Sequence, residues 1–88
     1  MTIKKVDTSS RFERSFSRLP LSVQQAAVER KAVFRDSPFA PTLRTHKLSG
    51  KLRGLWSFPV THSHRIVFEF LDDETALFHD IGDHSIYR

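Results

Sequence analysis

The sequence contains no cysteine, only three glycines and no long apolar run. Without cysteine the chain forms no disulfide and offers no thiolate to a metal ion. A small domain without disulfides fits the reducing cytosol. No apolar stretch near the N-terminus is long enough for a signal peptide or a membrane span. We therefore expect a cytoplasmic protein that does not enter a membrane.

Positive charge is present in excess. The sequence has 14 Lys and Arg against 10 Asp and Glu, which gives a formal net charge of +4 and favours an anionic partner such as nucleic acid or an acidic protein. The chain is short, so we expect residues 1–88 to form a single small domain. Its eight phenylalanines supply the large apolar side chains that such a small core needs.

The first half of the chain predicts two helices. One begins near Ser10, which has capping-box spacing to Glu13. It ends before Pro20, because proline lacks the amide donor that a helix interior needs. The second begins at Ser22 and ends near Asp36, and the short link between the two makes them an antiparallel hairpin. The first helix carries an apolar stripe formed by Phe12, Phe16 and Leu19. Its polar face is formed by Arg11, Arg14, Ser15 and Arg18.

The second half predicts three strands, which join a short strand at residues 2–6. Apolar and polar residues alternate in each strand, and turn residues separate them. The three strands fall at residues 55–61, 65–71 and 75–81. The order is therefore β-α-α-β-β-β. We expect an α+β fold in which the helical hairpin packs on one face of a small antiparallel sheet.

Polar side chains that can take part in a reaction gather where these strands end. Arg65 opens one strand and His84 follows the next, and such ends are neighbours in an antiparallel hairpin. Tyr87 can fold over the same edge, and His46 lies in the loop that leads to the sheet. These four residues are the predicted catalytic set. They suit RNA cleavage, in which the 2′-hydroxyl loses a proton, the 5′-oxygen gains one and the phosphorane needs positive charge.

Each member also has an ordinary explanation. Arg65 would be a surface ion-pair partner, His84 a polar loop residue and Tyr87 an apolar anchor for the tail. His62 and His64 have a spacing that could ligate a metal ion, but no cysteine or nearby carboxylate completes a ligand set. We therefore expect no metal and no small-molecule cofactor.

A basic stretch precedes the second strand. Lys47, Lys51 and Arg53 lie close to Trp56, a combination that suits phosphate contacts and base stacking. Trp56 alternates with Phe58, so we interpret the tryptophan as a core residue. We predict that Lys47, Lys51 and Arg53 bind RNA.

Three segments carry a family resemblance: HKLSGKLRGLWSFPV, HRIVFEF and the final IGDHSIYR. Over nearly its whole length the chain resembles the RelE/ParE superfamily of bacterial toxins, nearest to the RelE-, YoeB- and YafQ-like mRNA interferases. The resemblance implies a helical hairpin on a small antiparallel sheet. It also matches Arg65 to the phosphate-binding arginine, His84 and Tyr87 to the C-terminal His and Tyr of YoeB-like members, and His46 to a histidine before the first Gly-containing loop.

The chain departs from the family pattern at several positions. Two residues separate His84 from Tyr87, where YoeB-like members have none. Ser57 and Pro59 stand where RelE-type members carry lysines, and His64 replaces an aspartate of YafQ-like members. The catalytic glutamate of YoeB-like members has no certain counterpart. The identity of the general base is therefore left open.

The resemblance implies a toxin of a type II toxin–antitoxin module that cleaves mRNA on the ribosome by 2′-hydroxyl attack without a metal. Arg65 would stabilise the phosphorane, His46 and His84 would share the proton transfers, and Tyr87 would position the substrate. The implied partners are a cognate antitoxin and ribosome-bound mRNA. Two alternatives stay open, namely a non-enzymatic ParE-like inhibitor of DNA gyrase and an inactive relative that only binds antitoxin.

Overall fold

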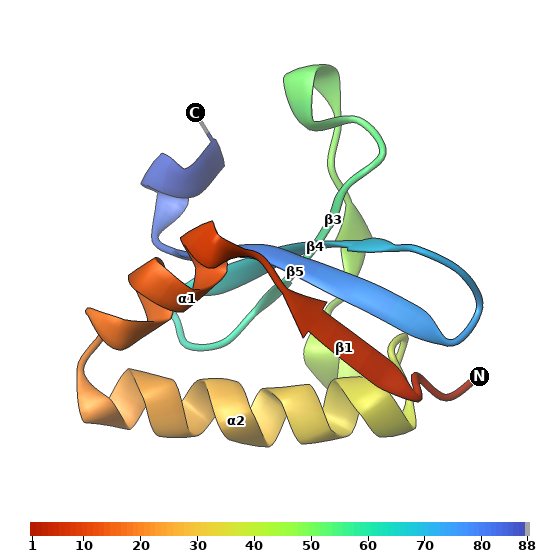
Figure 1. Cartoon of the computed structure of the whole chain (residues 1–88), viewed down its shortest axis with the longest axis horizontal. Helices are drawn as coiled ribbons and strands as arrows, with labels where there is room; N and C mark the ends of the chain where they lie inside the picture. Colours follow the sequence, from red (N-terminus) through yellow and green to blue (C-terminus); the bar gives the residue numbers. More distant parts are fainter. Residues whose placement is uncertain (88) are drawn as a thin grey trace.

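Two helices pack on a five-stranded mixed sheet in the computed structural model, which describes residues 1–87 (Figure 1). The α+β class and the order of the predicted elements are confirmed. The strands are β1 (Lys5–Thr8), β2 (His46–Lys47), β3 (Trp56–Pro59), β4 (Arg65–Phe70) and β5 (Thr75–Gly82). The helices are α1 (Ser10–Ser17) and α2 (Leu21–Asp36), and the 3-10 turns are η1 (Pro41–Leu43), η2 (Gly50–Leu52) and η3 (His84–Tyr87). No helix within residues 1–87 combines the length and apolar character needed to cross a bilayer.

The sheet is not wholly antiparallel, and this corrects the sequence-based expectation. The strand order is β1-β5-β4-β3-β2, and β1 pairs with β5 in parallel, with Val6 opposite Ala76. A parallel pair needs a long crossover connection, and here both helices and three strands lie between the two partners. The short strand β2 adds a second difference, because His46 and Lys47 pair with β3 where a loop was expected.

The starts of the first elements also differ from prediction. β1 lies at Lys5–Thr8 and not at residues 2–6. Ser9, and not Ser10, caps α1, since its hydroxyl accepts a hydrogen bond from the amide of Phe12 at 3.0 Å. α2 begins directly after Pro20, so Ser22 lies inside the helix and caps nothing. Proline is favourable at a helix start because it has no amide donor to leave unsatisfied.

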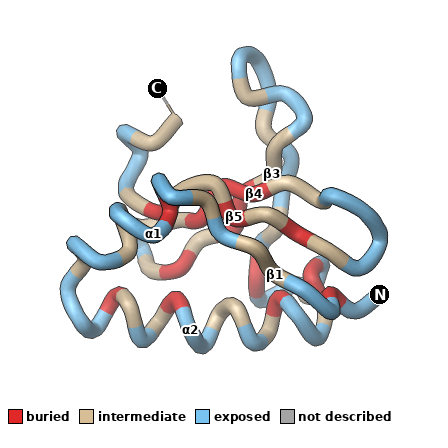
Figure 2. The backbone as a smooth tube through the Cα atoms, viewed as in Figure 1, coloured by how far each residue is buried: buried red, intermediate tan, exposed pale blue. Residues whose placement is uncertain are grey.

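Buried segments of α2 and of the sheet face each other (Figure 2), and phenylalanines form much of the core between them. Phe34 of α2 is completely buried. Its ring centre lies 4.8–6.2 Å from four other rings, which are those of Phe58, Phe68, Phe70 and Phe78. Burying one such side chain contributes about 1.5–3 kcal/mol. This contact therefore holds α2 against one face of the sheet.

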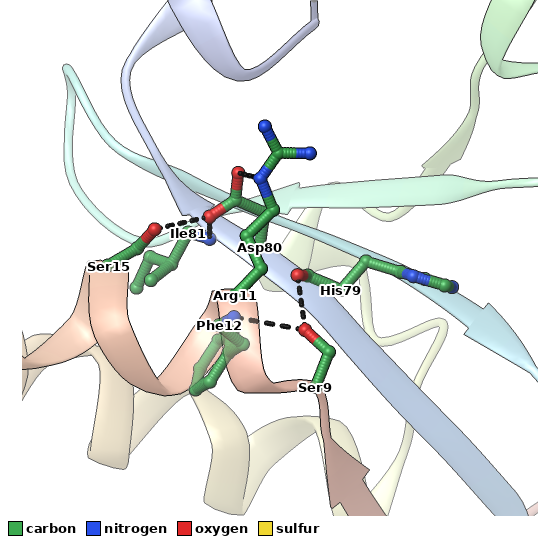
Figure 3. A network of polar contacts seen from close by, with 7 residues as sticks. All are labelled: Ser9, Arg11, Phe12, Ser15, His79, Asp80 and Ile81. Atoms are coloured by element: carbon green, nitrogen blue, oxygen red, sulfur yellow. Dashed lines mark hydrogen bonds and ion pairs between the residues drawn. The ribbon is translucent and has the colours of Figure 1, made fainter.

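A bulge in β5 redirects the end of that strand. Val67 of β4 pairs with Asp80 and Phe68 pairs with Phe78, so His79 has no partner on β4. The extra residue resets the alternation, and Phe78 and Ile81 are consequently both buried. Asp80 meets α1, where Ser15 Oγ donates to Oδ1 at 2.7 Å and Arg11 Nε lies 3.6 Å from Oδ2 (Figure 3). Ser9 Oγ donates to the His79 carbonyl at 2.7 Å, so three side-chain contacts fix α1 and its cap to β5.

Candidate active site

The candidate site lies on the sheet face that the helices leave uncovered, which we name the open face. Phe58, Ile66 and Phe68 point to the buried core, so the alternating residues Ser57 and Arg65 point to the open face. Two projections stand on this side of the sheet, namely η3 near the C-terminus and the loop that contains η2 (Figure 1). The open face therefore lies between two protruding segments.

Arg65 is placed as the sequence predicted. It begins β4 and pairs with Gly82 at the end of β5, which brings it beside the C-terminal turn. Its Nε atom is buried and has no hydrogen-bond partner among the described residues. A buried donor without a partner is costly. Arg65 is half-buried overall and forms no ion pair within residues 1–87, so its charge remains available to an anion such as phosphate.

Tyr87 connects Arg65 to the strand beside it. The Tyr87 ring centre lies 5.7 Å from the Arg65 guanidinium carbon, a cation–π arrangement. The Tyr87 hydroxyl lies 2.9 Å from Oγ of Ser57, which is completely buried. The His84 ring stands edge-on to Tyr87 with 6.0 Å between centres. The tail thus folds back onto the sheet as expected and brings together Arg65, His84 and Tyr87.

Gly82 makes the return of this tail possible. A Cβ atom at position 82 would lie 2.7 Å from Cγ2 of Ile86, closer than side-chain atoms approach each other. Ile86 belongs to η3, so a larger residue at position 82 would force the Ile86 side chain, or the turn that carries it, to shift. The glycine therefore allows the close packing of η3 on the end of β5.

His46 reaches the site through β2. It pairs with Ser57 of β3, and directly paired residues share a face. His46 is exposed, and its Nδ1 lies 2.9 Å from the carbonyl oxygen of Arg44. Nδ1 must carry a proton to donate to that carbonyl, which leaves Nε2 of the neutral ring as a proton acceptor. His46 therefore lies one strand from the Ser57–Tyr87 contact with a nitrogen free for chemistry.

The three predicted RNA-binding cations do not lie together. Lys47 follows His46 on β2 and faces the other side of the sheet, with its ammonium 5.4 Å from the centre of the Trp56 ring. Trp56 is half-buried and packs against Phe70 at the edge of the core, which agrees with its interpretation as a core residue. Lys51 and Arg53 are exposed and belong to the η2 projection.

Asp83 places a carboxylate between two histidines. Hydrogen bonds from the side chain and the backbone amide of Ser85 lower the pKa of Asp83, and the nearby charges of His64 and His84 lower it further. The amide contact measures 2.8 Å. Asp83 therefore remains ionised at neutral pH next to His84, at the entrance of η3.

Some site features had no signal in the sequence. Ser57 stood out only as a replaced lysine, and its tether to Tyr87 depends on the fold of the tail. Glu69 Oε1 and His79 Nε2 lie 2.8 Å apart. His79 lies at the bulge in β5, which the alternation of apolar and polar residues does not predict. Within residues 1–87 no three His, Asp or Glu side chains gather as a metal-binding group, and this includes His62 and His64.

Comparisons with known proteins identify the fold. No known protein family and no curated protein sequence matches the chain. Solved structures do match. A YoeB/ParE toxin from Agrobacterium tumefaciens superposes with a TM-score of 0.77 at 18% identity, over 91% of this chain and 98% of that one.

Two further structures agree with that match. YafQ from Escherichia coli gives a TM-score of 0.69 at 14% identity, over 93% of this chain and 94% of the other. The archaeal RelE–RelB complex from Pyrococcus horikoshii gives a TM-score of 0.74 at 16% identity, over 94% of this chain and 96% of the other. The match spans nearly the full length of each chain, so this protein has the fold of the RelE/ParE superfamily of toxins.

Proposed function

We propose that the chain is the toxin of a type II toxin–antitoxin module and that it cleaves ribosome-bound mRNA in the cytoplasm. The observation that carries this proposal is the position of Arg65, whose guanidinium lies against the ring of Tyr87 and has no ion-pair partner within residues 1–87. His46 and His84 lie on the same side of the sheet, and imidazole is the most common general acid–base group in proteins. A cation placed to receive a phosphate, with imidazoles nearby, supports phosphodiester chemistry.

The proposed reaction needs only groups of the RNA and of this chain. A base removes the 2′-hydroxyl proton, the 2′-oxygen forms a bond to phosphorus, and the bond from phosphorus to the 5′-oxygen breaks as that oxygen gains a proton. His46 and His84 carry the two proton transfers. Arg65 neutralises the phosphorane. The Tyr87 hydroxyl is held by Ser57, so its ring keeps the Arg65 guanidinium in place.

A protein partner accompanies this proposal. A RelE–RelB complex is among the structural neighbours. The η2 projection carries Lys51 and Arg53, exposed beside the open face. An acidic antitoxin that covers the open face would neutralise these cations and block Arg65.

Product analysis tests the chemistry. The purified protein is added to a translation extract with a defined message, and the cleaved ends are mapped. We expect a 2′,3′-cyclic phosphate or 3′-phosphate and a 5′-hydroxyl, with cleavage retained after chelation that keeps ribosomes intact. A single 2′-deoxy nucleotide at the cleavage position should abolish the cut. Products that end in a 3′-hydroxyl would contradict the mechanism.

Substitutions test the assigned residues. Arg65→Ala should lower the cleavage rate about 10²–10³-fold through loss of a transition-state charge contact, and His84→Ala about 10²–10⁴-fold. His62→Ala, in the exposed β3–β4 loop, is the control and should remain active. All three should stay soluble and bind the antitoxin. If Arg65→Ala and His84→Ala cleave at the parental rate, the active site lies elsewhere.

Inhibition of DNA gyrase is the second candidate, because one structural neighbour carries both the YoeB and the ParE names. Induced expression separates the two functions. An mRNA interferase stops translation and cuts the message before replication changes. A gyrase inhibitor alters DNA supercoiling first and leaves the message whole.

A further inference from the structure

A second basic feature adjoins the candidate active site. A cleft of about 470 Å³ lies between α1 and the C-terminal segment. Three arginines of α1 line one side, and the end of β5 with part of η3 lines the other. The residues that matter for its chemistry are Arg11, Arg14, Arg18, His64, Asp80 and Ser85. The three arginines belong to the polar face of α1, which the proposed reaction does not use.

The carboxylates in this cleft are already satisfied by the protein. Asp80 accepts from Ser15 and from the amide of Ile81, and Arg11 lies beside its second oxygen (Figure 3). Asp83 accepts from the amide of Ser85. Arg14 and Arg18 are exposed, and neither forms an ion pair within the described part of the chain. Two guanidinium groups are therefore available to an external anion.

The position of the cleft relates it to Arg65. His64 precedes Arg65 in the chain, and Gly82, which also lines the cleft, pairs with Arg65 across the strands. Turn η3 contributes residues to both places. An RNA strand with one phosphate at Arg65 would therefore reach the cleft with the next part of its backbone.

We propose that this cleft binds phosphates of an RNA backbone beside Arg65, with Arg14 and Arg18 as the contacts. The identity of the ligand as RNA rests on the proposed function. The chemistry of the lining agrees, since its side chains are mostly charged or carry hydroxyl groups, and guanidinium forks bind phosphate oxygens in pairs. The phosphates belong either to the message or to ribosomal RNA.

The salt dependence of RNA binding tests the cleft without any need for cleavage. The probe is a fluorescent RNA oligonucleotide with 2′-deoxy substitution at the cleavage position, titrated at several salt concentrations. Arg14→Ala/Arg18→Ala should reduce the slope of log affinity against log salt by about 1.4, since each phosphate contact on a single strand contributes about 0.7. Arg11 and Ser15 are unchanged, so α1 stays fixed to Asp80.

Lys4→Ala/Lys5→Ala is the matched control. It removes the same charge, but Lys4 and Lys5 lie near Thr75, at the opposite end of β5 from the cleft. Its slope should stay close to that of the parent protein. If the two double variants have equal slopes, general electrostatics explains the binding and the cleft proposal is overturned.

Two further binding measurements, with ribosomes and with the antitoxin, identify the ligand. If the arginine variant loses affinity only for ribosomes that lack message, the phosphates are those of ribosomal RNA, and the cleft is still a phosphate site. If it loses affinity for the antitoxin alone, the cleft binds an acidic protein and the proposal fails. A parent protein that binds the oligonucleotide through Arg14 and Arg18 but cleaves no message would refute the proposed function and leave the cleft as assigned.

Discussion

The two faces of the sheet use the same strands for opposite purposes. On the covered face, Phe58, Phe68 and Phe78 surround Phe34, and each of these rings is almost completely buried. On the open face, Arg65 Nε has no hydrogen-bond partner within residues 1–87, and a single hydroxyl contact ties Tyr87 to Ser57. Adjacent residues in one strand therefore face the core and the candidate site in turn. Substitutions on one face should change folding, and those on the other should change activity.

The largest expected effect is a loss of stability from the covered face. Phe34→Ala should reduce the free energy of unfolding by about 3–5 kcal/mol, through lost burial and the cavity that remains. That is a large part of the total stability of a small domain, about 5–15 kcal/mol. Urea unfolding measures the change. Val28→Ala on the same helix is the control, since Val28 is 61% exposed and should change stability by less than about 0.5 kcal/mol. Equal costs at the two positions would contradict the packing described above.

The next effect separates geometry from chemistry on the open face. Gly82→Ala should displace η3, because its new Cβ would meet Ile86 at 2.7 Å. A displacement of about 1 Å in catalytic groups can lower the reaction rate about 10²-fold. The double variant Gly82→Ala/Ile86→Ala removes the clash and should recover most of the activity. If the single variant cleaves mRNA normally, or if the double variant gains nothing, the turn does not set the position of His84 and Tyr87.

A smaller effect measures the contact between Ser57 and Tyr87 on the open face. Ser57→Ala and Tyr87→Phe each remove one side of the 2.9 Å hydroxyl contact. Each should cost about 0.5–1.5 kcal/mol of stability. A double-mutant cycle should return a coupling of the same order, because the two changes remove one shared interaction. Additive losses would show that Ser57 does not hold Tyr87 in solution.

The smallest effect concerns pH. The pKa of Asp83 is lowered, chiefly by Ser85, so the folded state favours the ionised carboxylate. Its stabilising contribution is present above the unfolded-state pKa of 3.8 and is lost as pH falls through the lower folded-state value. The difference in melting temperature between the parent protein and Asp83→Asn should therefore shrink in acid. A difference that stays constant from neutral pH to below the folded-state pKa would contradict the role of the Ser85 contacts.

Local patterns in the sequence predicted much of this arrangement. Alternation located the three later strands, and the rule for antiparallel hairpins placed Arg65 beside the segment of His84 and Tyr87, which the structure brings together. Their catalytic roles remain predictions. The opposite orientation of Lys47 and His46 was not predicted, because a loop was expected where the structure has β2.

The errors arose where distant segments determine the structure. The direction of β1 depends on its partner β5, and the two-residue strand β2 exists only because β3 lies beside it. The bulge at His79 follows from the fit of β5 between β4 and α1. None of these three features is determined by the residues within a few positions of it in the sequence. Local sequence patterns therefore could not predict them.

The parallel pairing of β1 with β5 has a consequence for how the chain is made. The inner strand β5, which lies between β1 and β4, is the last of the five to be synthesised, and the Ser9–His79 contact joins residues 70 positions apart. Until residues 75–82 are available, β1 has no partner and Phe34 lacks the ring of Phe78. Such non-local contacts also slow folding. A chain that still lacks residues 75–87 is therefore missing part of its core and the turn that carries His84, so the core and the candidate site are completed in the same late step.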